Sequence, residues 1–194
     1  MKVLSRWSGL IGTWGGLIWA ILFFMEATNS AFDLRDLLLN QPAPALVLVL
    51  GVLFQAAGYY GLASTSLDLP IPRISATVCA AGALVQSVAL LAVSTFGLGA
   101  AWLLGILGEL AITIALATFA IVSLPTELPR LIKTIPFLMV PVYFVGWALD
   151  PGSFPAAPLD FVNLSATLYG LLWLPFGLAI WNNHWHQIGL KARS

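Results

Sequence analysis

Charged residues are scarce in this sequence. They make up 8% of the 194 residues, while hydrophobic residues make up 60%; a typical soluble domain has about 25% charged and roughly 45–50% apolar residues. A chain of this length cannot bury so much apolar surface against itself, so most of that surface has to face lipid. The composition therefore excludes an ordinary water-soluble domain and predicts an integral membrane protein surrounded by a lipid bilayer.

Three further features of the composition exclude particular kinds of site and partner. Eight Lys and Arg balance eight Asp and Glu, so the chain lacks the basic surface that would make nucleic acid an expected partner. The single cysteine, Cys79, excludes an intramolecular disulfide and a Cys-rich zinc site. The Gly-x-Ser-x-Gly, His-Glu-x-x-His and Gly-x-x-x-x-Gly-Lys motifs of hydrolases, metalloproteases and phosphate-binding loops do not occur. We therefore expect no cofactor and no metal.

Six apolar runs, which contain no charged residue except Glu109 and Lys133, have about the length of 20 residues that crossing a bilayer requires. We predict membrane-spanning helices at Trp7–Met25, Pro44–Ser66, Ile74–Phe96, Ala100–Val122, Leu131–Leu149 and Phe161–Trp181. The third and fourth come from one run of 35 residues, Ile74 to Gly108, which we divide at Phe96-Gly97-Leu98-Gly99 because its glycines favour a turn. The sequence thus predicts an all-α membrane protein, a bundle of six transmembrane helices in a single polytopic domain, residues 1–194.

The basic residues indicate the orientation of these spans. Short loops with many Lys and Arg stay in the cytoplasm. With six spans, one side of the membrane holds only Arg35, and the other holds Lys2, Arg6, Arg73, Arg130, Lys133, Lys191 and Arg193. We therefore expect both termini to be cytoplasmic, and we interpret the chain as a multi-pass protein of the cell membrane, most simply a bacterial inner membrane.

The longest connection, Glu26 to Ala43, carries the signals of a short helix. Asn29 and Ser30 are suited to cap a helix over Ala31–Leu39, which Pro42 would end. Such a segment is either a lid over an outward-facing cavity or a linker lying on the membrane surface.

One polar layer stands out in the middle of the predicted spans. Glu109 is the only acidic or basic side chain well inside a span, and because burial disfavours a charged carboxyl group, we expect the neutral acid there. Gln55, Gln86 and Glu109 lie 11, 10 and 9 residues from the outer ends of their spans. At 1.5 Å per residue they share a depth of about 14–17 Å, near the midplane. Tyr169 falls near the same layer, and Thr113 lies on the same face of its span as Glu109.

Two interpretations of this layer remain open. The side chains form either a hydrogen-bonded clamp between helices or a binding site. The candidate ligand-binding residues are Glu109, Gln55, Gln86, Tyr169 and Thr113. Our first functional hypothesis is a protein that binds or transports a small solute at this layer. An intramembrane enzyme that uses Glu109 as an acid or base is a further alternative.

The first span carries a stripe of small residues, which lets another helix approach closely. The stripe comprises Ser8, Gly12, Gly16 and Ala20. It serves either the bundle itself or a partner membrane protein or second copy that docks at Gly12 and Gly16. The second use corresponds to a different function, that of a non-catalytic accessory subunit of a larger membrane complex.

The overall layout resembles the substrate-binding subunits of bacterial energy-coupling-factor vitamin transporters. The shared features are six spans, a cytoplasmic N-terminus, a small-residue stripe on the first span and a long first outer loop. The resemblance covers the layout alone, and no residue motif carries over. It implies a membrane bundle that binds a small substrate, without implying particular site residues.

Overall fold

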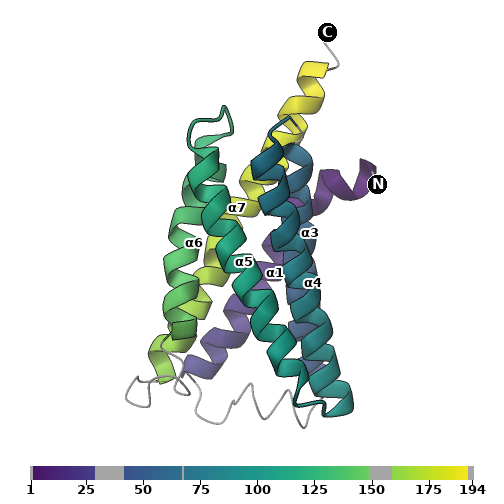
Figure 1. The fold of residues 1–194 in the computed structure, drawn as a ribbon, viewed down its shortest axis with the longest axis vertical. Coiled ribbons are helices and arrows are strands. Elements are labelled where there is room, and N and C mark those ends of the chain that lie inside the picture. Colours follow the sequence, from purple (N-terminus) through teal and green to yellow (C-terminus); the bar gives the residue numbers. More distant parts are fainter. Residues whose placement is uncertain (1, 29–41, 67, 149–158, 192–194) are drawn as a thin grey trace.

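The structure is a computed structural model that describes residues 2–28, 42–66, 68–148 and 159–191, and this part of the chain contains six helices and no strand (Figure 1). The helices are α1 (Lys2–Thr28), α3 (Pro42–Thr65), α4 (Pro70–Phe96), α5 (Ala101–Ser123), α6 (Arg130–Ala148) and α7 (Leu159–Lys191). The predicted all-helical fold is confirmed, and each predicted span coincides with one helix apart from residues at the ends. The predicted helix Ala31–Leu39 lies outside the described residues.

Five of these helices have the length and composition of membrane spans. Within the described residues, the suitable segments are Trp7–Thr28, Ala45–Thr65, Pro70–Phe96, Ala101–Ser123 and Asn163–Trp185. They present large apolar side chains to the outside; Val88, Leu103 and Ile114 are 63%, 65% and 65% exposed. Such surfaces suit lipid better than water. Helix α6, which has 19 residues and carries Arg130 and Lys133 near its start, is not among the five.

A tight turn connects α4 to α5, as the glycines at this place predict. Gly97 follows the end of α4 with a φ of 61°, a left-handed conformation that glycine adopts without steric cost. Its backbone N–H donates to the Val93 carbonyl, and the N–H of Leu98 donates to the Ala92 carbonyl. These bonds satisfy the carbonyls at the end of α4 and turn the chain back into α5.

The helices pack in the order of the sequence and close into a ring (Figure 1). Each helix lies against the next one along the chain, and α7 returns to pack along α1. A smaller contact joins α3 to α7, so α1 lies over the seam between these two helices. The largest fully buried side chains include Trp173, Tyr59, Tyr169, Phe119 and Phe176. The interior is thus rich in aromatic rings.

The small-residue stripe of α1 is used inside this bundle. A Cβ atom at Gly12 would lie 2.8 Å from the Gly58 Cα on α3 and 2.9 Å from the Trp173 ring on α7. A Cβ atom at Gly16 would collide with the Cβ of Trp173. Both glycines therefore allow α1 to enter the seam between α3 and α7. A partner helix docking at Gly12 and Gly16 would have to displace one of these two helices.

Candidate functional site

Glu109 of α5 is joined to Gln86 of α4 by a hydrogen bond between their side chains. The Gln86 Nε2 donates to the Glu109 Oε1 at 2.9 Å. Gln86 is 5% exposed, whereas Glu109 is only partly buried. The equal depth predicted for these two residues is what a direct bond between antiparallel neighbours requires. Glu109 is therefore not completely enclosed by the helix contact.

Two glycines allow α4 and α5 to come close enough for this bond. A Cβ atom at Gly108 would lie 2.7 Å from the Gly82 carbonyl oxygen and 3.0 Å from the Gln86 backbone nitrogen. A Cβ atom at Gly82 would lie 2.8 Å from the Gly108 carbonyl oxygen. The two backbones therefore touch directly beside the Gln86–Glu109 pair, a contact that only glycine permits.

Tyr169 of α7 belongs to the same layer and brings a partner that the sequence analysis missed. Its hydroxyl lies 2.8 Å from the hydroxyl of Tyr59 on α3, and both side chains are buried. Glu109 lies near enough to Tyr169 for a charge on its carboxyl group to act on the Tyr169 hydroxyl. The sequence does contain a signal for Tyr59: it follows Gln55 by four residues, so the two lie on the same helix face. The layer thus extends from the α4–α5 contact to α3 and α7.

Thr113 lies one turn from Glu109, but its hydroxyl serves the helix backbone. Its Oγ1 donates to the Glu109 carbonyl oxygen at 2.9 Å. Threonine in a membrane helix commonly satisfies its hydroxyl in this way. Thr113 therefore supports the backbone at Glu109, and a direct role toward a solute has no geometric support of its own.

Gln55 is buried on the α1 side of the layer, away from the Gln86–Glu109 bond. It is 4% exposed, and a Cβ atom at Gly15 of α1 would lie 2.7 Å from its backbone nitrogen. Its Nε2 has no hydrogen-bond partner among the described residues. The structure thus joins Gln86 to Glu109 and Tyr169 to Tyr59, and it places Gln55 where α3 packs against α1.

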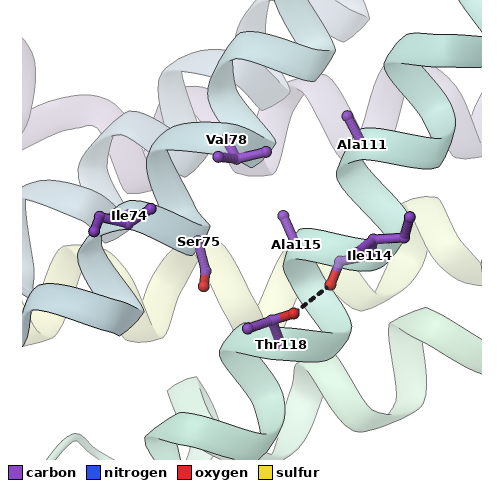
Figure 2. A pocket seen from close by; sticks show the side chains of 7 residues that line it. All are labelled: Ile74, Ser75, Val78, Ala111, Ile114, Ala115 and Thr118. Carbon is purple, nitrogen blue, oxygen red and sulfur yellow. Dashed lines mark hydrogen bonds between the residues drawn. The ribbon is translucent and has the colours of Figure 1, made fainter.

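A separate groove lies between α4 and α5 and contains none of the predicted site residues. It encloses about 260 Å³ and is lined by Ile74, Ser75, Val78, Ala111, Ile114, Ala115 and Thr118 (Figure 2). Its two hydroxyl groups are bonded within their own helices, Thr118 to the Ile114 carbonyl at 2.8 Å and Ser75 to the Ile71 carbonyl at 3.0 Å. The groove therefore offers a mostly apolar surface.

The described residues contain no group of three or more His, Cys, Asp or Glu side chains arranged to hold a metal ion. No protein-family model matches the chain, and no curated protein or solved structure matches it either. The polar layer itself is therefore the basis for assigning a function.

Proposed function

We propose that this protein binds a small polar solute inside its helical bundle, at the layer formed by Glu109, Gln86 and Tyr169. The observation that carries the proposal is the 2.9 Å hydrogen bond from Gln86 to the carboxyl group of Glu109, a residue that is only partly buried. A hydrogen-bonded clamp between helices needs only amide or hydroxyl groups, and the free-energy cost of burying these is lower than that of burying a carboxyl group. A carboxyl group in the middle of a span is the more costly choice and is typical of a functional site.

The proposal includes a membrane arrangement with six spans and both termini in the cytoplasm. Helix α6 packs between α5 and α7, so it lies among helices that can cross the membrane. The charge of Lys133 is held at the end of α6, where its Nζ donates to the Thr126 carbonyl oxygen at 2.8 Å. Its long side chain can thus reach the interface while the apolar remainder of the helix spans the bilayer. The cell membrane is the proposed location.

The interior of the ring supports binding at this depth. Among the described helices, α5 makes no backbone contact with α7, although Tyr169 and Glu109 interact electrostatically. The backbones of α5 and α7 therefore stay apart in this part of the bundle. Tyr59 and Tyr169 supply hydroxyl groups, and Glu109 supplies a carboxyl group. Few polar groups among apolar and aromatic side chains are typical of small-molecule sites.

The test is native mass spectrometry of the protein extracted from its own membranes within native lipid. Three forms are compared: the wild type, Glu109→Gln, and the control Glu127→Gln, which removes an exposed carboxyl in the α5–α6 loop. We expect the wild type and the Glu127→Gln variant to carry the same bound small molecule, and the Glu109→Gln variant to lose it. Glutamine keeps the size of the side chain, so the loss would report the carboxyl chemistry.

Two results would contradict the proposal. One is a small molecule that stays bound to the Glu109→Gln variant as well as to the wild type. The other is a stoichiometric protein partner with no small molecule, which would favour an accessory subunit and leave Glu109 as a structural hydrogen-bond acceptor.

A further inference from the structure

The buried side-chain N–H donors without an acceptor in the described residues include one on α1 and one on α3. These two are Nε2 of Gln55 on α3 and Nε1 of Trp19 on α1, and neither has a hydrogen-bond partner among the described residues. Gln55 is 4% exposed and Trp19 is 7% exposed. A buried donor without an acceptor is destabilising, so native proteins rarely keep one without a water, an ion or a ligand to accept the bond.

Trp19 lies in the seam that α1 enters between α3 and α7. Gly12, which contacts both of these helices, is seven residues before it, so the two residues share one face of α1. The Trp19 ring meets the Tyr169 ring edge-on at a centroid distance of 6.4 Å. Trp19 therefore packs directly on the residue that connects α7 to the polar layer.

Gln55 lies near the same place on α3. Gly12 lies beside Gly58 and Gly15 lies beside Gln55, so α1 and α3 run antiparallel. Trp19 is four residues beyond Gly15, which places it about one turn along the contact from Gln55. Side chains on a helix lean toward its N-terminus. Because the two helices run in opposite directions, Trp19 and Gln55 lean toward each other.

We propose that Gln55 Nε2 and Trp19 Nε1 together hold a hydrogen-bond-accepting oxygen, a carbonyl or a carboxylate, of the bound solute. This inference rests on the proposed function, since it assigns one end of the same solute. Tyr59 is one turn from Gln55, and its hydroxyl bonds to that of Tyr169, which interacts with Glu109. The solute would thus have its acceptor oxygen beside α1 and α3 and a second polar group toward Glu109. Neither Trp19 nor its indole N–H was among the residues predicted from the sequence.

The test uses the indole N–H of Trp19 as a reporter. The full chain is labelled with ¹⁵N-tryptophan, embedded in lipid nanodiscs and freed of bound small molecules, and the Trp19 signal is assigned from its loss in Trp19→Phe. Three probes are added: cyclopentanone with a neutral carbonyl, acetate with a carboxylate, and cyclopentane, which has the ring but no acceptor. Trp14, which is 61% exposed, serves as the control indole.

We expect cyclopentanone or acetate to shift the Trp19 signal downfield until it saturates, with cyclopentane and the Trp14 signal giving no such shift. A shift with cyclopentanone indicates that the accepting group of the solute is a neutral carbonyl, and a shift with acetate indicates a carboxylate. Gln55→Met removes one donor and should weaken the binding of that probe about 2- to 10-fold. The Tyr60→Phe control, on a different face of α3, should leave it unchanged.

A Trp19 signal that responds to no oxygen probe would overturn the inference, and a buried water held by both donors would produce that result. A Trp19 signal that responds equally to cyclopentane would overturn it too. The two experiments together separate the two proposals, because the oxygen probes carry no second polar group that could reach Glu109. A solute that stays bound to Glu109→Gln in native mass spectrometry contradicts the site at Glu109 without affecting the Trp19 response, whereas a failed donor pair gives no Trp19 response even in the wild type.

Discussion

The contact between α4 and α5 can be tested with two glycines of the same helix. Gly108 and Gly105 lie three residues apart on α5, and both are buried. A Cβ atom at Gly108 would lie 2.7 Å from the Gly82 carbonyl oxygen, whereas one at Gly105 would lie 3.6 Å from the Ala89 Cβ, an ordinary contact. We predict that Gly108→Ala destabilises the protein and that Gly105→Ala stabilises it.

The magnitude follows from three contributions. Replacing glycine by alanine within a helix stabilises either variant by about 1 kcal/mol. At Gly108 the new methyl group has to push the helices apart by about 0.7 Å to reach an ordinary contact distance, and overpacking of this kind costs about 1–3 kcal/mol. The same movement would lengthen the Gln86–Glu109 bond from 2.9 Å to about 3.6 Å, beyond the usual range.

Hydrogen bonds between membrane helices contribute about 0.6 kcal/mol on average. The two variants should therefore differ in free energy of unfolding by about 1.5–4 kcal/mol. The measurement is reversible unfolding by SDS in lipid–detergent micelles, followed by circular dichroism. Equal stability of the two variants, or a more stable Gly108→Ala variant, would refute the direct backbone contact beside Glu109.

Two further predictions concern the membrane topology and the turn. If the protein has six spans with both termini in the cytoplasm, green fluorescent protein fused to the C-terminus should fluoresce in a bacterial host, and alkaline phosphatase fused there should be inactive. The reverse pattern would place the C-terminus outside the cytoplasm and contradict the predicted topology. In the α4–α5 turn, Gly97→Ala should lower the free energy of unfolding by about 1–2 kcal/mol because of the left-handed φ of 61°. Gly99→Ala is the control, since neither position has an atom within 4 Å of the new Cβ; equal effects of the two substitutions would argue against the left-handed turn.

The positions of the helices, and the depth predicted for their residues, follow from the local sequence. Apolar runs of sufficient length have to be helical within lipid, because every backbone N–H and C=O must be bonded inside its own segment. Phe96-Gly97-Leu98-Gly99 divides the longest run where the structure has its turn. Counting residues from the span ends was enough to place Gln86 and Glu109 at one depth, and the structure joins them by a hydrogen bond.

Which side chains meet across the bundle was decided by tertiary structure alone. Depth fixes a position along the membrane normal, but the rotation of each helix and the identity of its neighbours depend on how all the helices pack together. For this reason the sequence grouped Gln55 with Glu109, while in the structure the Gln55 backbone packs against Gly15 of α1 and Gln86 bonds to Glu109. The partnership of Tyr59 with Tyr169 and the approach of Trp19 arise because α7 returns to pack along α1, a long-range contact that no local pattern encodes.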